Sequence, residues 1–242
     1  MIRPYFFSAT AKSDEKQTLL YHSLTRLVEH GFICSDDFEF KTDNNEPLAK
    51  CYNEVLKRNW SDDRIIVFVH DDVMLDDLYL VEKLSIAFSS DESIAVVGIA
   101  GARRITSLDC PMLWHLMAGK GNLSGEASHF YKLKDGEIPD CGSPNLTTVF
   151  GFHGPVCLID GVFMAVDPRR LNGVGFDENC PSKWNFYDLN FSLSCTLSGL
   201  KMVTRPIRLV HMSPGLTERT EDWEVGDKYF RERLISVIQK NN

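Results

Sequence analysis

Short apolar runs alternate with helix-like segments through the first hundred residues of the chain. Strands are predicted at residues 4–9, 38–41, 65–69 and 94–99, and helices at about 14–30, 47–58 and 77–89. The first helix carries apolar residues at the i, i+4, i+7 and i+8 positions of one buried face, namely Leu20, Leu24, Leu27 and Val28. Strands separated by single helices indicate βαβ units, which build parallel sheets with right-handed crossovers. The pattern therefore predicts an α/β fold with a mixed, mostly parallel central sheet flanked by helices.

The alternation stops after residue 100, where a turn-rich stretch covers residues 101–154. Irregular structure is predicted there, with a hairpin near Lys134-Asp135-Gly136, and long irregular segments of this kind often act as lids or binding loops. Further along, the pattern predicts strands at 156–159 and 162–166, a helix opening near Tyr187, a strand ending at His211 and a last helix at about 221–238. The last helix is amphipathic, so it is expected to dock onto the rest of the protein.

Composition places the chain among ordinary globular proteins, because 43% of its 242 residues are hydrophobic and 25% are charged. This length suits a single domain, residues 1–242, whose first half at 1–100 is typical of a nucleotide-binding unit. A net charge of −8 gives no overall electrostatic footprint for nucleic acid or an anionic membrane. The apolar runs are about five residues long, far short of the ~20 that span a bilayer, so we expect a cytoplasmic protein without a membrane span. Seven scattered cysteines without a CxxC pair are expected to be buried free thiols.

The most informative stretch is the apolar run at 65–69, which leads directly into His70, Asp71 and Asp72. A continuous apolar run of this kind is typical of a central strand covered on both faces. Ligands of open α/β sheets collect at the carboxyl ends of such strands, so a metal site is one reading of the three polar residues. Capping of the next helix, or an ordinary turn, is the other.

Five short polar motifs follow one another along the chain: His70-Asp71-Asp72, Asp160-Gly161, Phe176-Asp177-Glu178, Tyr187-Asp188 and His211-Met212-Ser213-Pro214-Gly215. In this order and spacing, from about residue 40 to residue 215, the chain resembles the family-2-like glycosyltransferases of the GT-A fold. Within that group it is similar to the branch related to the streptomycin-biosynthesis StrF-type domain. The resemblance implies a GT-A-type nucleotide-diphospho-sugar transferase fold, with acceptor binding and catalysis in residues 101–242.

The resemblance also implies a reaction, which is displacement at the anomeric carbon of a nucleotide-diphosphate sugar by an acceptor hydroxyl. The leaving diphosphate needs a cation, and Mg²⁺ or Mn²⁺ serves as a Lewis acid in such chemistry. Asp72 matches the second carboxylate of the Asp-x-Asp metal motif and is expected to be a metal ligand. His211 is expected to be a second ligand, which would favour Mn²⁺. Without the resemblance, a satisfied histidine at a strand end is the favoured interpretation of His211.

Asp188 is the expected general base, because inversion requires a carboxylate on the face of the sugar opposite the diphosphate. The alternative is a structural role, because an acidic side chain in the first turn stabilises a helix by interacting with the helix dipole. Asp160 and Gly161 are assigned to the donor sugar or the acceptor, where a residue without Cβ permits close approach of a ligand. Trp184 either offers an aromatic face to a sugar ring or packs in the core.

The nucleotide is expected to contact the ends of the second and third strands. Asp43 and Asn45 are assigned to the nucleoside, with helix capping by Asn44 or Asn45 as the alternative. His70 and Asp71 are also assigned to donor binding, where His70 contacts ribose or phosphate, or simply packs.

Three departures from the family pattern keep other functions open. The metal motif is His-Asp-Asp rather than Asp-x-Asp, Asn185 stands where a histidine is usual, and Asn190 replaces a frequent aspartate. The departures at Asn185 and Asn190 motivate a catalytically silent, glycosyltransferase-like binding module as one alternative. A phosphohydrolase or nucleotidyltransferase acting on nucleotide sugars is the other, although the chain contains no P-loop or Gly-x-Gly-x-x-Gly motif. The sequence leaves the acceptor open among a glycan, a lipid-linked sugar, a protein, a metabolite and a modified nucleic acid, and does not indicate an oligomeric state.

Overall fold

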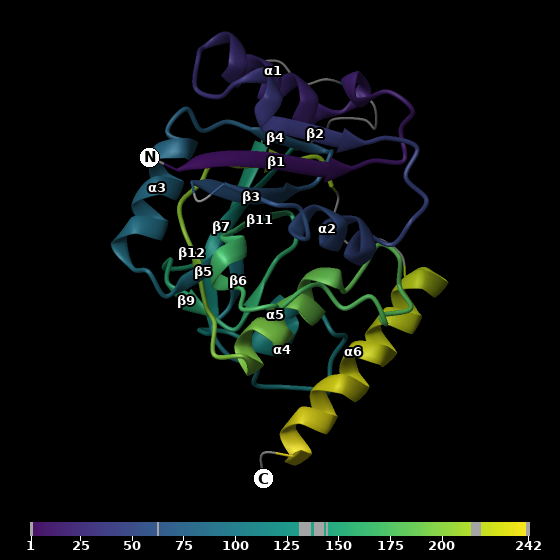
Figure 1. The fold of residues 1–242 in the computed structure, drawn as a ribbon. Coiled ribbons are helices and arrows are strands. Elements are labelled where there is room, and N and C mark those ends of the chain that lie inside the picture. The colour runs from purple at the N-terminus through teal and green to yellow at the C-terminus, as the bar shows by residue number, and fades with distance from the viewer. Residues whose placement is uncertain are drawn as a thin grey trace.

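The structure is a computed structural model that describes residues 2–61, 63–130, 137, 143, 145–213 and 219–240. Two sheets lie at its centre and helices cover them (Figure 1). The predicted hairpin at Lys134-Asp135-Gly136 and the Pro214-Gly215 end of the last motif lie outside the described residues. Within the described part, none of the helices combines the length and the apolar character needed to cross a membrane.

The larger sheet has seven strands, and five of them run in one direction. Their order is β2 (Phe38–Lys41), β1 (Arg3–Ala9), β3 (Arg64–Val69), β11 (Phe163–Val166), β5 (Ile94–Gly98), β12 (Lys201–Thr204) and β9 (Pro155–Val156). Only β11 and β9 are antiparallel to their neighbours within this sheet. The predicted mixed, mostly parallel sheet is confirmed. Its strands β11, β12 and β9 come from the second half of the chain, so both halves build it.

Strand β3 shows why the apolar run at 65–69 forms a central strand. Alternate side chains of a strand point to opposite faces of the sheet. Ile65 and Val67 belong to the core under α1 (Leu19–Glu29) and α3 (Leu80–Ser90), whereas Ile66 and Phe68 belong to the core under α2 (Leu48–Leu56). Because both faces are covered, every position of the run is buried and a continuous apolar sequence results.

The smaller sheet joins segments that lie far apart in the sequence. Its order is β10 (Leu158–Ile159), β6 (Ala100–Ala102), β7 (Leu123–Phe130), β13 (Leu209–His211) and β4 (Val73–Leu75), and β8 (Asn145–Gly151) also pairs with β7. The chain passes from β3 in the larger sheet to β4 in the smaller one through His70, Asp71 and Asp72. The three polar residues therefore form the joint between the two sheets.

The remaining helices are α4 (Trp114–Ala118), α5 (Tyr187–Leu197) and α6 (Glu221–Lys240), and short 3-10 turns lie at Glu15–Gln17, Ser35–Asp37 and Pro168–Arg170. α6 runs along one side of the molecule to the C-terminal end, drawn in yellow (Figure 1). Its residues Trp223, Phe230 and Leu234 are buried, which confirms the predicted docking of this helix.

Several predicted boundaries are wrong for identifiable reasons. The helix expected from residue 14 begins at Leu19, because the Thr18 side chain accepts a hydrogen bond from Tyr21 N and caps the helix there. The helix expected from residue 77 begins at Leu80, because the carboxylate of Asp77 accepts hydrogen bonds from the backbone N–H groups of Tyr79 and Arg208. The predicted strand at 156–159 is divided into β9 and β10 at Cys157, whose N–H donates to Ala102 O.

Residues 101–154 are more regular than predicted, since they contain β6, α4, β7 and β8 within the described part. β4 and β12 were not predicted either. The cysteine prediction is confirmed in part: Cys51, Cys180 and Cys195 are buried free thiols, but Cys34 is exposed.

Asn53 on α2 provides a test of how the two halves of the chain are joined. Its buried side chain donates to Phe176 O (2.9 Å) and accepts from Phe176 N (2.8 Å). Asn53→Ala leaves both backbone groups without a partner, so we expect the free energy of unfolding to fall by about 2 kcal/mol in urea denaturation. The exposed Asn45→Ala control should change it by less than about 0.5 kcal/mol. Equal effects of the two substitutions would contradict this account.

Candidate active site

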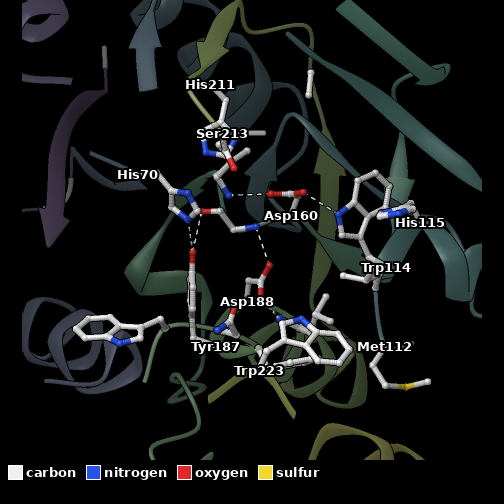
Figure 2. Close-up of a pocket in the computed structure, with 18 of the residues that line it drawn as sticks. His70, Met112, Trp114, His115, Asp160, Tyr187, Asp188, His211, Ser213 and Trp223 are labelled. Carbon is white, nitrogen blue, oxygen red and sulfur yellow. Dashed lines mark hydrogen bonds between the residues drawn. The ribbon is translucent and has the colours of Figure 1, made fainter. Parts of the chain in front are cut away.

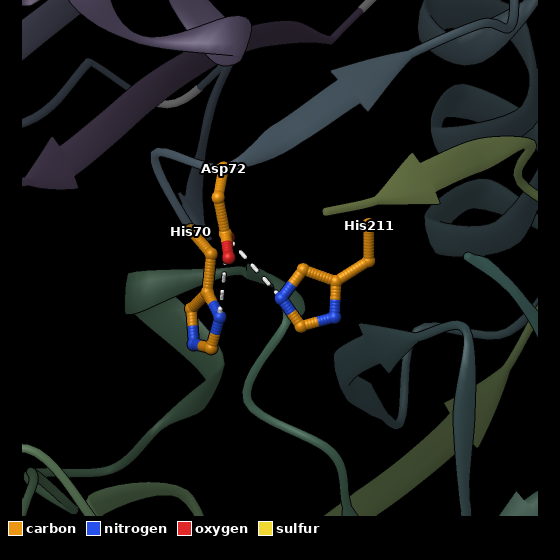
Figure 3. A group of neighbouring side chains, drawn as sticks. All are labelled: His70, Asp72 and His211. Atoms are coloured by element: carbon orange, nitrogen blue, oxygen red, sulfur yellow. Dashed lines mark ion pairs between the residues drawn. The ribbon is translucent and has the colours of Figure 1, made fainter. Parts of the chain in front are cut away.

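Three side chains that could hold a metal ion meet at the joint between the sheets. His70 and Asp72 come from the segment between β3 and β4, and His211 is the last residue of β13 (Figure 3). His211 Nε2 lies 3.1 Å and His70 Nδ1 lies 3.9 Å from Asp72 Oδ1. One ligand atom from each residue lies within 4.8 Å of the others. The predicted pair of Asp72 and His211 is thus brought together, and His70 joins it.

The hydrogen bonds of Tyr187 favour one tautomer of His70. The Tyr187 hydroxyl donates to Gly161 O (3.2 Å) and lies 2.7 Å from His70 Nε2. Gly161 O can only accept, so both contacts of the hydroxyl are satisfied when Tyr187 donates to Gly161 O and accepts from His70 Nε2. The lone pair of His70 Nδ1 then faces Asp72, as in metal sites where the second ring nitrogen orients the histidine.

The donor set fits a divalent cation. Asp72 Oδ1 is shielded from solvent, yet it accepts no hydrogen bond of good geometry within the described part of the chain. A buried carboxylate oxygen without a donor is unfavourable unless a positive charge lies beside it. Burial lowers the pKa of His70, so its ring is neutral and free to ligate. Burial alone would lower the pKa of His211, but the Asp72 carboxylate raises it above its ordinary value.

A cavity of about 480 Å³ extends from His70 and His211 (Figure 2). Its wall combines aromatic and apolar groups with a few convergent polar ones, which is typical of a small-molecule site. The lining residues used below are His70, His211, Asp160, Gly161, Tyr187, Asp188, Trp114, Trp184, Phe186 and Trp223.

Asp188 lies in the first turn of α5, and its carboxylate accepts two backbone hydrogen bonds. Gly161 N donates to Oδ2 and Leu189 N donates to Oδ1, both at 2.8 Å. Burial and then the neighbouring Asp160 carboxylate raise the pKa of Asp188 to about 7, although the two N–H donors lower it. A carboxyl group that titrates near neutral pH is suited to accept a proton during a reaction.

Asp160 and Gly161 lie beside Asp188 in the cavity wall. Trp114 Nε1 donates to Asp160 Oδ2 (2.7 Å), and Val162 N donates to Asp160 Oδ1 (2.9 Å). A Cβ added at Gly161 would lie 2.4 Å from the Tyr187 hydroxyl oxygen and 2.9 Å from Asp188 Cβ. The Asp-Gly pair therefore allows α5 to approach the end of β10 closely.

Other predicted residues lie away from this cluster or at its edge. Asp71 accepts from the Thr10 hydroxyl (2.5 Å) at the end of β1 and does not line the cavity. Asp43 and Asn45 are exposed in the loop after β2. Asn44 bonds Glu46 N and O within that loop, and the N-cap of α2 is Pro47 without a side-chain hydrogen bond, so neither asparagine caps the helix. Trp184 is 40% exposed and borders the cavity, so it is not a core residue.

Two further contributors to the cavity were missed by sequence reasoning. Trp114 lies in the stretch predicted to be irregular, and a tryptophan within such a stretch gives no periodic signal. Trp223 lies on the last helix, which was expected only to dock onto the rest of the protein, yet it lines the cavity. The Tyr187-Asp188 motif did carry a signal for Tyr187, whose contact with His70 links α5 to the candidate metal site.

The family described as "Glycosyltransferase like family" matches residues 37–218. The match covers most of the chain and all the motifs noted above, so the protein belongs to this glycosyltransferase-like family. Among curated proteins, none matches the chain significantly. The matched residues include the segments that carry His70, Asp72, His211 and Asp188.

Solved structures agree with a GT-A-type fold. GalNAc-T7 with UDP, GalNAc and Mn²⁺ has a TM-score of 0.53 at 9% identity, over 88% of this chain and 44% of that one. A197 from STIV has a TM-score of 0.46 at 14% identity, over 91% and 99% of the two chains. At 9% identity the similarity to GalNAc-T7 shows the fold alone. We draw no conclusion from the similarity to A197, because its TM-score is below 0.5.

Gly161→Ala tests the close approach of α5 to β10. The added methyl group must displace Tyr187 or Asp188, so we expect the free energy of unfolding to fall by about 1–3 kcal/mol in urea denaturation. The matched control is Gly154→Ala, whose new methyl group would meet only the end of the Arg103 side chain at 3.3 Å. If Gly154→Ala destabilises the protein as much as Gly161→Ala, the packing argument fails.

Proposed function

We propose that the protein is a metal-dependent, inverting glycosyltransferase that moves a sugar from a nucleotide-diphosphate donor to an acceptor hydroxyl. The observation that supports this most directly is the shared cavity, whose wall includes His70 and His211 of the cluster with Asp72 at one end and Asp188 further along. Membership of a glycosyltransferase-like family and the GT-A-type fold support the same reaction. Within the family, the five motifs favour the StrF-type branch.

His70, Asp72 and His211 are proposed to hold Mn²⁺ or Mg²⁺, which would supply Lewis-acid stabilisation of the departing diphosphate. Two imidazoles beside one carboxylate favour Mn²⁺, since imidazole suits transition metals better than Mg²⁺. GalNAc-T7, with its bound UDP, GalNAc and Mn²⁺, is consistent with such a donor and cation. In this proposal His70 is a metal ligand rather than a ribose contact, which revises the role expected from the sequence.

Asp188 is proposed to remove the proton of the acceptor hydroxyl. The bond between the anomeric carbon and the diphosphate oxygen breaks, and its electron pair leaves with the diphosphate. The acceptor oxygen forms the new bond to that carbon from the opposite face, and its proton passes to Asp188. The N–H groups of Gly161 and Leu189 keep the carboxylate oriented, while Asp160 accepts hydrogen bonds from sugar hydroxyls beside it.

The nucleotide is proposed to lie along the carboxyl ends of β1, β2 and β3, where open α/β sheets bind ligands. Asp43, Asn45 and Asp71 remain its predicted contacts. The close approach expected at Gly161 is made by Tyr187 and Asp188 of α5 rather than by a ligand. Trp184 is placed at the rim of the cavity, where its exposed ring suits contact with a sugar.

A nucleotide screen tests the donor site. With Mn²⁺ present, we expect one of UDP, GDP, CDP, ADP or dTDP to raise the thermal midpoint, because a ligand of the native state stabilises it by mass action. Asp72→Asn should abolish that shift, whereas Asp188→Asn, the matched control, should retain it. A wild-type protein with no shift for any nucleotide would contradict the proposed donor site.

The reaction is tested by incubation with the sugar derivative of the nucleotide that binds. We expect slow release of nucleoside diphosphate and free sugar, because water can replace the acceptor. Release of nucleoside monophosphate or inorganic phosphate would instead identify a phosphohydrolase or nucleotidyltransferase. Binding without any turnover, even with acceptors, would identify a silent binding module.

Asp188 should give the reaction a characteristic pH dependence. A base must be ionised, so kcat/KM should rise with pH and level off above about 7, the raised pKa of Asp188. The titratable groups that face it are Asp160, Tyr187, Tyr52 and Cys180. Asp188→Asn should lower kcat by about 10²–10⁴-fold and remove this rise. A variant that keeps the wild-type rate and profile would show that another group is the base.

A further inference from the structure

Phe186 has a backbone conformation that is unusual for a large side chain. Its φ is +64° and its ψ is 0°, in the left-handed region that glycine adopts readily and bulky residues seldom do. Phe186 is the last residue before α5, and no side-chain hydrogen bond caps the helix there. The direction in which α5 leaves this residue determines where Asp188, two positions later, meets the cavity.

The aromatic ring of Phe186 is held by α6. It is 4% exposed and lies against the rings of Trp223 and Phe230, with centroids 5.4 and 6.3 Å away. Between these two residues stands Gly226, where an added Cβ would be 2.4 Å from Phe186 Cδ2 and 2.9 Å from Ser182 Cβ. Glycine is a poor helix former, so the close approach of the ring accounts for its presence inside α6.

The segment before Phe186 is tied to the first turn of α6 by one carboxylate. Asp222 accepts hydrogen bonds from the Ser182 hydroxyl (2.7 Å), Lys183 N (2.7 Å) and Asn185 Nδ2 (2.9 Å). Burial raises the pKa of Asp222, but these donors lower it below its ordinary value, so the carboxylate stays ionised. Charge-assisted hydrogen bonds of this kind are stronger than neutral ones.

α6 also contacts the segment before α4. The Asp227 carboxylate accepts from Met112 N (2.8 Å), and Arg231 donates to Cys110 O (2.8 Å). Met112 and Trp114 line the cavity, as Phe186 and Asp188 do. One helix therefore contacts both of the segments that supply these lining residues.

We infer that α6 is a positioning element for the reaction: Gly226 and Asp222 hold Phe186 in its left-handed conformation, and this conformation aims Asp188 at the acceptor. The inference rests on the proposed function, since it assigns a role to the residues that orient its base. Neither Phe186 nor Gly226 takes part in the chemistry. They act through the placement of α5.

Gly226→Ala is the direct test, because the new methyl group must displace the Phe186 ring. We expect kcat to fall by about 100-fold, the loss that a shift of about 1 Å can produce in a catalytic group. The KM for the donor should stay within about twofold, since the metal cluster lies on other elements. Hydrogen exchange of the Gly161 and Leu189 amides should accelerate, because both donate to Asp188.

The matched control is Val225→Ala, the neighbouring position on α6, whose side chain is 38% exposed. It should leave kcat and both exchange rates unchanged. If Gly226→Ala fails to fold, Asp222→Asn provides the same test. It keeps the shape of the side chain but replaces one hydrogen-bond acceptor by a donor, so it weakens the tie between α6 and the segment before Phe186. A folded Gly226→Ala or Asp222→Asn protein with wild-type kcat and wild-type amide exchange would overturn the inference, as would an effect confined to the donor KM.

Amide exchange separates this inference from the proposed function, because it needs neither donor nor acceptor. If the wild-type protein transfers no sugar but Gly226→Ala still accelerates exchange at Gly161 and Leu189, α6 positions Asp188 and the proposed reaction is wrong. If the wild-type protein transfers sugar but amide exchange is unchanged in Gly226→Ala and Asp222→Asn, the proposed reaction is supported and the inferred role of α6 is wrong.

Discussion

The pairing of β4 with β13 is the constraint on which the site depends. In this antiparallel pair Val73 lies opposite His211, and Met212 N donates to Asp72 O (2.9 Å). The side chains of Asp72 and His211 therefore meet because the backbone register brings them together. β3, buried on both faces in the larger sheet, fixes the other end of the same short connection. A shift of one residue in register would exchange the faces of β4 and separate the two side chains.

Two carboxylates close to this joint have opposite electrostatic environments. Burial raises the pKa of Asp72, yet the adjacent imidazoles of His211 and His70 lower it below its ordinary value. Desolvation and then the neighbouring Asp160 carboxylate raise the pKa of Asp188 to about 7. The surroundings thus move the pKa values of two aspartates apart, and this difference suits the two side chains to different tasks. Asp72 is suited to remain ionised beside a cation, and Asp188 is suited to gain and lose a proton near neutral pH.

The sequence predicts some of this arrangement because particular residues carry strong local signals. The apolar run of β3 and the polar residues after it are such a case. His211 and Asp72 could be assigned to one metal site only by resemblance, since periodicity says nothing of contacts between distant segments. β6, Ala100-Gly101-Ala102, was missed because it has no β-branched residue. Its glycine is required by the approach of Leu158 O, which a Cβ would meet at 2.2 Å. Strand β8 was missed because it is largely exposed and lacks an alternating pattern.

The asparagines that depart from the family pattern take on a different meaning once α6 is considered. Asn185 donates to Asp222 at the start of α6, and the backbone and side-chain oxygens of Asn190 both accept from Arg233 further along the same helix. Asn190 also donates to Phe186 O, the carbonyl of the left-handed residue. Both side chains therefore support the contact between α5 and α6, and neither belongs to the His70, Asp72 and His211 cluster. The two departures thus have a structural role in the way this chain anchors its last helix.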